Sequence, residues 1–162
     1  SRDVADKIVS KFPQIDKLWV LTGEGQMFAA PELRGATIPY YNADVEQAVL
    51  LRDRLAADTG FVLPQVVECD FAMRYEGRAM GAALPAGAIV LLRAVEREAI
   101  IPGAEYVIIS RKIVTLRIVR TGTQAGEFRL VAGDKENFDD IVLKAKDIEA
   151  VYKVVGKLII NQ

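Results

Sequence analysis

Residue types that commonly carry catalysis or bind metals are scarce in this sequence. It contains no histidine and one cysteine, Cys69. The absence of histidine excludes Ser–His–Asp and Cys–His catalysis, metal sites built on imidazole and a histidine-based pH switch. A single cysteine excludes an intramolecular disulfide and a metal site built from a cysteine cluster. Cys69 lies in the alternating run VVECDFAM, which favours a buried, unreactive thiol over a nucleophile.

Two groups of charged residues suggest binding sites, and each has a plainer interpretation. Arg78, beside the small residue Ala79, is compatible with an anion site. Four acidic residues resemble a metal-binding loop only loosely: Asp134, Glu136, Asp139 and Asp140. In both cases a solvated turn is the favoured interpretation. We therefore expect neither a metal nor a cofactor.

The segment 77–90, GRAMGAALPAGAIV, resembles, without a gap, the phrase G-D-S-M-x-P-T-x-x-x-G-D-x-V of LexA-type repressors and their self-cleaving relatives. Four residues match that phrase: Gly77, Met80, Gly87 and Val90. Three departures are Arg78 and Ala88 in place of aspartates, and Ala82 in place of proline. Ala79 stands at the position of the nucleophilic serine, and a methyl group cannot attack a carbonyl. The resemblance implies the fold of a serine–lysine peptidase without its nucleophile.

In the same family a lysine on a strand, in a phrase like T-V-K-R, accepts the proton of the serine hydroxyl. A lysine does so only where burial lowers its pKa, so that it is an unprotonated base. The matching phrase is TLRI at 115–118, which places Arg117 at the position of the lysine. Arginine stays protonated in proteins and cannot act as that base. Lys112, five residues earlier on the same expected strand, points to the opposite face. The resemblance therefore implies that both members of the dyad are lost.

The self-cleaving relatives cut an Ala–Gly or Cys–Gly bond on an extended loop. Here the corresponding stretch, 42–60, predicts a helix with Asn42 as its cap and Gly60 as its terminator. The apolar face expected for that helix comprises Val45, Ala48, Val49, Leu55 and Ala56. The stretch 42–60 contains no such pair, and the Ala–Gly pairs of the chain, such as 86–87 and 125–126, lie inside the expected body of the domain. The scissile bond is thus lost together with the nucleophile.

The first residues predict short helices. Residues 2–11 have an amphipathic pattern that Pro13 ends, and a helical turn over 15–21 runs into the glycine-rich cap at 22–25. The run KIVSKFPQIDKLWVLTGEGQMF resembles the end of the helix-turn-helix domain of phage-type repressors, in which Trp19 and Leu21 would be core residues. The alternative is any helical hairpin with a glycine cap. The resemblance places the recognition helix upstream of this chain, which we expect to be a fragment of a longer protein.

From residue 66 onward the pattern is one of short strands. These runs are rich in Val, Ile and Tyr and are separated by turn signals such as Pro102–Gly103. We expect strands at 66–75, 88–95, 106–110, 113–120, 128–132, 141–143 and 151–160. Strands at this spacing predict a mostly β fold, coiled or barrel-like, rather than a parallel α/β sheet. Together with the resemblance, they predict a LexA/signal-peptidase-like coiled β-sheet domain with short N-terminal helices.

Composition and charge limit the classes of function. The 162 residues include 51% hydrophobic ones, enough for one domain with a sizeable core, and the net charge is −1. This charge provides no field that would hold a polyanion, so we expect DNA binding only through the upstream helix-turn-helix domain. No apolar run is long enough to span a bilayer, and we expect a cytoplasmic protein. The expected organisation is a helix-turn-helix remnant at 1–28, a linker at 29–41 and a LexA-like domain at 42–162.

The last expected strand, in DIEAVYKVVGKLII, is apolar on both faces. Ordinary core is one interpretation, but in the relatives the C-terminal strands form the dimer interface, and an exposed apolar edge in a soluble protein usually has a partner. We therefore expect a homodimer whose interface includes Val151, Val154, Val155, Leu158 and Ile160.

The resemblance implies the dimerisation and regulatory portion of a phage-type transcriptional repressor, peptidase-like but inactive. One alternative is an active self-cleaving peptidase with an unrecognised dyad. Another is a switch module whose vacated catalytic groove binds a peptide, an effector or an antirepressor.

Overall fold

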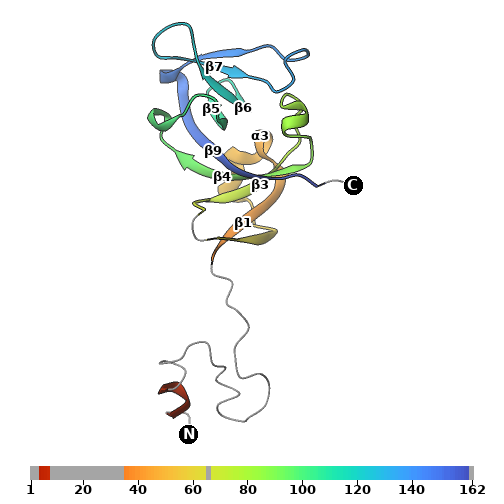
Figure 1. The fold of residues 1–162 in the computed structure, drawn as a ribbon, viewed down its shortest axis with the longest axis vertical. Helices are drawn as coiled ribbons and strands as arrows, with labels where there is room; N and C mark the ends of the chain where they lie inside the picture. The colour runs from red at the N-terminus through yellow and green to blue at the C-terminus, as the bar shows by residue number, and fades with distance from the viewer. Residues whose placement is uncertain (1–3, 8–34, 65–66, 161–162) are drawn as a thin grey trace. The chain divides into compact units, whose positions relative to one another are not determined.

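The computed structural model describes residues 4–7, 35–64 and 67–160, and the chain divides into two compact units, 1–34 and 35–162 (Figure 1). In the first unit, residues 4–7 form a helical turn within the helix expected at 2–11. The expected turn at 15–21, its glycine cap and the expected core residues Trp19 and Leu21 lie outside the described residues.

The second unit is built on one sheet of nine strands, so the prediction of a mostly β fold is confirmed. The strands are β1 Gly35–Asp44, β2 Thr59–Pro64, β3 Phe71–Tyr75, β4 Ala88–Val95, β5 Glu105–Ser110, β6 Val114–Thr121, β7 Glu127–Val131, β8 Ile141–Lys144 and β9 Ile148–Leu158. Their order in the sheet is β2-β1-β3-β4-β9-β5-β6-β7-β8. All neighbouring strands are antiparallel except β1 and β3, which are parallel.

Helical segments in this unit are short. They are α3 Val45–Ala48, followed directly by the 3-10 turn η1 Val49–Arg54, and the 3-10 turns η2 Gly81–Ala83, η3 Arg97–Ala99 and η4 Ala145–Asp147. A helix of one turn is not stable by itself in water, so α3 depends on its packing against the sheet.

The sheet packs around two hydrophobic cores, and the strands that share a core show that the sheet curves. One contains buried side chains from β3, β4, β5 and β6 together with Val45 and Val49 of the α3–η1 segment. Since three strands separate β3 from β6 in the sheet order, the sheet must bend for both to reach the same core (Figure 1). Residues of β5 alternate between the two cores: Val107 and Ile109 enter the first, Tyr106 and Ile108 the second. Burial on both faces explains the uninterrupted apolar run of β5.

The region before β3 differs from the sequence-based prediction. Residues 35–41, expected in the linker, belong to β1, and the second compact unit begins at residue 35 rather than 42. Pro39 of β1 pairs with Gly60 of β2, and the rings of Tyr40 and Phe61 meet edge to face with centroids 5.6 Å apart. Proline and glycine at 31–39 indicated a linker, but proline is tolerated near the edge of a sheet.

The helix expected over 42–60 is wrong in its extent. Helical backbone covers only Val45–Arg54, and Gly60 lies within β2 instead of terminating a helix. Of the expected apolar face, Val45 and Val49 are buried, whereas Leu55 and Ala56 are exposed. The strand expected from residue 66 begins at Phe71, and residues 67–70 are not in a strand.

The position of β9 corrects a second expectation. It lies inside the sheet, paired with β4 through residues 151–158 and with β5 through residues 148–153 (Figure 1). Only residues 154–158 of β9, which lie beyond the pairing with β5, have no paired strand on the side of β5. The apolar character of both faces therefore reflects, over its first half, the two cores that β9 separates.

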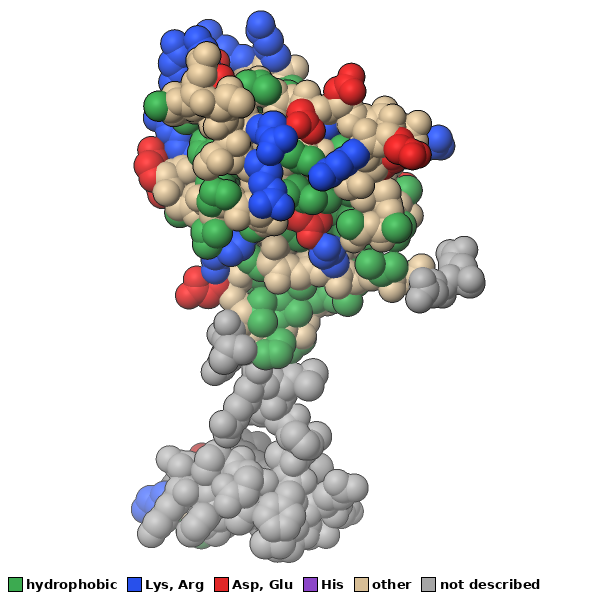
Figure 2. Space-filling view, turned by 45° about the horizontal axis from the view of Figure 1, so that its top comes forward, with side chains coloured by type: hydrophobic (Ala, Val, Ile, Leu, Met, Phe, Trp, Pro, Cys, Tyr) green, Lys and Arg blue, Asp and Glu red, His purple; other side chains and the backbone are tan. Residues whose placement is uncertain are grey.

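Basic and acidic side chains share the face of the molecule shown in Figure 2. No helix in the described part of the chain has the length and hydrophobicity needed to cross a membrane.

Candidate functional site around Ala79 and Arg117

Ala79 lies in a tight turn after β3 that packs closely on another loop. Its carbonyl accepts a hydrogen bond from the Asp134 N–H at 2.9 Å. At Gly133 a side chain would collide with the carbonyl of Met80, so glycine is required for this approach. Ala79 is 8% exposed, and its methyl group adds no polar atom to the site. The turn is thus fixed by its backbone, and it presents no nucleophile.

The four residues that match the LexA-like phrase have structural roles. Met80 and Val90 are fully buried in the first core. Gly87 has φ +93°, a backbone conformation that favours glycine. A Cβ at Gly77 would lie 2.5 Å from both the hydroxyl oxygen of Tyr75 and Oε1 of Glu46. This glycine therefore makes room for two polar side chains.

Arg117 is 7% exposed on β6. Its Nη1 donates to the Asp139 carbonyl at 2.8 Å, and its guanidinium carbon lies 5.9 Å from the centre of the Phe138 ring. Its Nε has no hydrogen-bond partner in the described part of the structure. Neither a carbonyl nor a ring neutralises the cation, although a ring attracts it. Lys112 is exposed and precedes β6, in the turn after β5.

Glu46, on α3, was not among the sequence-predicted site residues, yet it lies at the centre of this region. One carboxylate oxygen accepts the Leu116 N–H at 2.9 Å. Burial raises the pKa of Glu46 above its ordinary value and Asp44 adds to the rise, whereas the Leu116 N–H, the Thr115 hydroxyl and the charge of Arg117 oppose it. Glu46 is therefore a partly desolvated carboxyl group on which the charge of the buried Arg117 also acts.

The hydroxyl of Tyr75 links the two sides of the site. It accepts a hydrogen bond from the N–H of Met80, which directly follows Ala79, at 3.4 Å. Burial, followed by the negative charge of Glu46, raises the pKa of Tyr75 to about 12, against the opposing effects of the Met80 N–H and Arg117. At neutral pH the phenol is protonated, so it is not a nucleophile. We define the polar cluster as Glu46, Tyr75, Thr115 and Arg117. Of the positions that the resemblance assigns to the dyad, Arg117 thus belongs to this cluster and Ala79 lies next to it.

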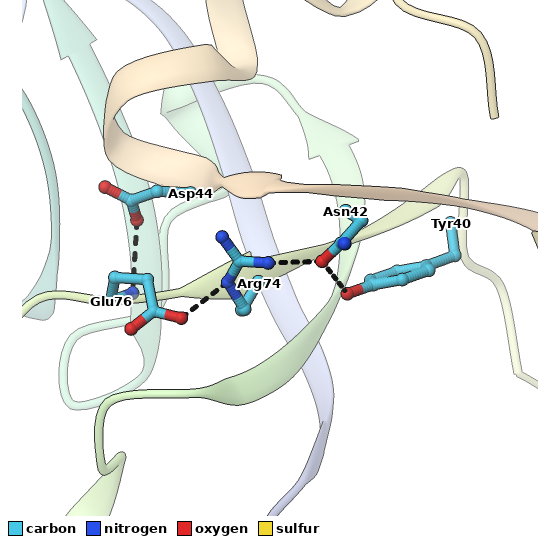
Figure 3. A network of polar contacts seen from close by, with 5 residues as sticks. All are labelled: Tyr40, Asn42, Asp44, Arg74 and Glu76. Carbon is cyan, nitrogen blue, oxygen red and sulfur yellow. Dashed lines mark hydrogen bonds and ion pairs between the residues drawn. The ribbon is translucent and has the colours of Figure 1, made fainter. Parts of the chain in front are cut away.

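A second polar network binds the end of β1, which precedes α3, to Arg74 and Glu76 (Figure 3). Arg74 of β3 donates to the side-chain oxygen of Asn42, which also accepts a hydrogen bond from the hydroxyl of Tyr40. The Nε of Arg74 lies 2.5 Å from a carboxylate oxygen of Glu76. The Asp44 carboxylate accepts the Glu76 N–H at 3.1 Å. The pairing of β1 with β3 shifts register between Tyr41 and Asp44, and these contacts fill the irregularity. Since α3 starts directly after Asp44, the network positions Glu46 indirectly.

Of the other charged candidates, Asp134 and Asp140 have local partners, and Glu136 and Asp139 are exposed. Arg78 is exposed in its turn. The Asp134 carboxylate accepts the Asn137 side chain at 2.9 Å, and Asp140 pairs with Arg129 at 3.1 Å. Within residues 4–7, 35–64 and 67–160, no group of three or more His, Cys, Asp or Glu residues is arranged to hold a metal.

Cys69 is partly buried in the loop that precedes β3. Its thiol lies 3.4 Å from the carbonyls of Phe71 and Leu92, and burial raises its pKa. A thiol with a raised pKa is a poor nucleophile at neutral pH.

The expected interface residues fall into two groups. Val151 is buried in the second core and Val154 packs against the first, so neither is a free surface. Val155 is partly exposed, whereas Leu158 is 42% and Ile160 66% exposed. An interface on β9 is therefore restricted to its C-terminal half.

Comparison with known proteins adds no assignment, since no family model and no curated protein matches this chain.

Proposed function

We propose that the chain is the dimerisation and regulatory portion of a phage-type transcriptional repressor, with a LexA-like domain that has lost its peptidase activity. One observation carries the proposal. Arg117 belongs to the polar cluster that contains Tyr75, and Ala79 lies next to this cluster, because the N–H of the following residue, Met80, donates to the Tyr75 hydroxyl. A lost serine–lysine dyad would leave its two positions beside one polar cluster, and neither alanine nor arginine can perform the step.

A dimerisation domain contributes to repression through effective concentration. When one DNA-binding head of a dimer is bound, the second binds its half-site as an intramolecular event. Loss of dimerisation then weakens operator binding without altering a base contact. A domain of this kind needs a stable fold and a self-complementary surface, and it needs no catalysis.

Inertness is the direct test against the alternative of an active self-cleaving peptidase. Purified protein is incubated at alkaline pH, which deprotonates any lysine base, and its intact mass is followed over days. We expect a single species throughout. A specific internal cut that persists with protease inhibitors would contradict the proposal.

Restoration of the dyad extends the test. The double variant Ala79→Ser, Arg117→Lys should still show little cleavage, because the segment that corresponds to the scissile loop forms β1, α3 and η1 and holds no Ala–Gly bond. Efficient self-cleavage by this variant would mean that the substrate segment is retained, against the proposal.

A further inference from the structure

The edge of β6 that faces away from β5 is unpaired at Leu116. On that side the pairing with β7 begins only at Ile118. The Leu116 N–H, which a sheet would leave for a neighbouring strand, donates instead to a carboxylate oxygen of Glu46 at 2.9 Å. A side chain from α3 thus takes the position that a strand carbonyl would occupy.

The groups that surround this carboxylate are those that recognise a carboxyl group. Thr115 contributes a hydroxyl, Leu116 a backbone N–H, and Arg117 a positive charge. Arg117 is more than nine-tenths buried, and its Nε has no partner among the described residues. Its hydrogen-bonding contact is a neutral carbonyl, and its positive charge acts on Glu46 by lowering the pKa of that carboxyl group. The remaining titratable neighbours of Glu46 are Asp44 and the protonated phenol of Tyr75.

We propose that residues 115–117 of β6 form a carboxyl-binding site that the free protein fills with its own Glu46, so that α3 is a self-docked cover over the degenerate catalytic position. Hydrophobic contacts hold the same cover, because Val45 and Val49 enter the first core. The occupant is a segment of this chain, and the ligand class that competes with it is a small or peptide carboxylate. The regulatory meaning of the site rests on the proposed function, whereas the site itself rests on the contacts of Glu46.

Chemical rescue tests the site. Glu46→Ala removes the carboxyl and leaves its donors unpaired, and sodium acetate is the probe, compared with sodium chloride at equal ionic strength in slightly acidic buffer. In chloride we expect fast hydrogen exchange at the Leu116 amide and a lowered melting temperature. Acetate at high millimolar concentration should restore protection at Leu116 and raise the melting temperature in a saturable manner.

Two variants make the rescue specific. Glu68→Ala removes an exposed carboxyl that pairs with Arg93, outside the network that positions Glu46, and should show no more response to acetate than the wild type. Glu46→Gln retains an acceptor for the Leu116 N–H and fills the site, so it should stay protected and insensitive to acetate.

The inference fails if Glu46→Ala keeps Leu116 protected in chloride, or if acetate acts equally on Glu46→Ala and Glu68→Ala. If Glu46→Ala does not fold in chloride, recovery of the fold in acetate supports the site, and failure of both Glu46→Ala and Glu46→Ser to respond overturns it. Internal cleavage or a monomeric wild type would contradict the proposed function, but neither would change the expected response of Glu46→Ala to acetate.

Discussion

At the scale of single residues, the environment of Glu46 disfavours the ionised form of its carboxyl group. Burial is the largest influence on its carboxyl group and raises its pKa from the ordinary value of 4.5. A carboxyl whose pKa is raised on folding stabilises the fold at pH below its ordinary pKa, and this contribution is lost as the pH rises through the folded value. The ionised form of Glu46 is thus less favourable in the folded protein than in the unfolded chain.

Glu46→Gln should therefore be more stable than the wild type at neutral pH. The amide keeps an acceptor for the Leu116 N–H and removes the cost of burying a charge, although it also loses the attraction of Arg117. The advantage should shrink as the pH falls through the raised pKa of Glu46, because the wild-type carboxyl is then neutral as well. Urea unfolding between pH 4 and 8 measures the difference. A variant that is less stable by the same margin at every pH would refute this interpretation.

Gly77 provides a second prediction at this scale. Gly77→Ala places a Cβ 2.5 Å from the Tyr75 hydroxyl oxygen and from Glu46 Oε1, and overpacking of this kind costs about 1–3 kcal/mol. Gly156→Ala is the matched control, since the added Cβ meets the end of the Leu91 side chain at 2.8 Å, which can move. Equal stability of the two variants in urea would show that the cluster tolerates the added methyl group.

Sequence patterns located Ala79 and Arg117 but not Glu46. The first two follow from short phrases in which each residue has a fixed place. Glu46 acts on Leu116, 70 residues away, and no local pattern records that contact. Its own segment shows only helical periodicity, in which a glutamate between apolar positions is typical of a solvated face.

At the scale of elements, α3 and η1 depend on the sheet beneath them. Val45 and Val49 are buried, whereas Leu50 and Leu51 are exposed. Arg52 of η1 lies 4.1 Å from the centre of the Phe71 ring, which adds a cation–π contact to the apolar ones. Packing therefore decides which residues of this segment matter for stability.

Truncation of the two faces tests that division. Val45→Ala removes two buried methyl groups and should cost about 2 kcal/mol of unfolding free energy. Leu50→Ala, on the exposed face, should change it by no more than about 0.5 kcal/mol. Denaturant unfolding compares them, and a larger loss for Leu50→Ala would place the buried face elsewhere.

Strands were predicted better than the helical segment for a physical reason. Runs such as 88–95 match β4 at both ends, because β-branched residues between turn signals define a strand locally. The helix expected over 42–60 extended too far, since its continuation into β2 depends on pairing with β1 across the hairpin. Residues 35–41 were assigned to the linker for the same reason, because their strand character depends on the pairing of β1 with β2 and β3.

At the scale of the whole molecule, the order of strands was outside the reach of sequence patterns. β9 follows β8 in the chain but lies between β4 and β5, and such long-range pairing leaves no local signal. The consequence for the interface is specific: Val151, 3% exposed, belongs to the core, so Val151→Asp should unfold the protein rather than dissociate it.

Net charge sets the expectation for nucleic acid. With a charge of −1 and with acidic and basic side chains sharing a face (Figure 2), this chain should not bind duplex DNA at physiological salt, where phosphate contacts supply most non-specific affinity. A gel shift with random-sequence duplex measures this. Sub-micromolar binding by the chain alone would contradict it.

The central claim is that this chain is a dimerisation domain, and its mass in solution tests it most directly. Leu158 at the end of β9 and Ile160 just beyond the strand are exposed, and a symmetric pair needs only one self-complementary patch. Burial of such side chains contributes roughly 1.5–3 kcal/mol each before the costs of association. Sedimentation equilibrium at micromolar concentrations should give twice the chain mass for the wild type and the mass of one folded chain for Val155→Asp and Leu158→Asp. A wild-type monomer, or a dimer that neither substitution affects, would contradict the account.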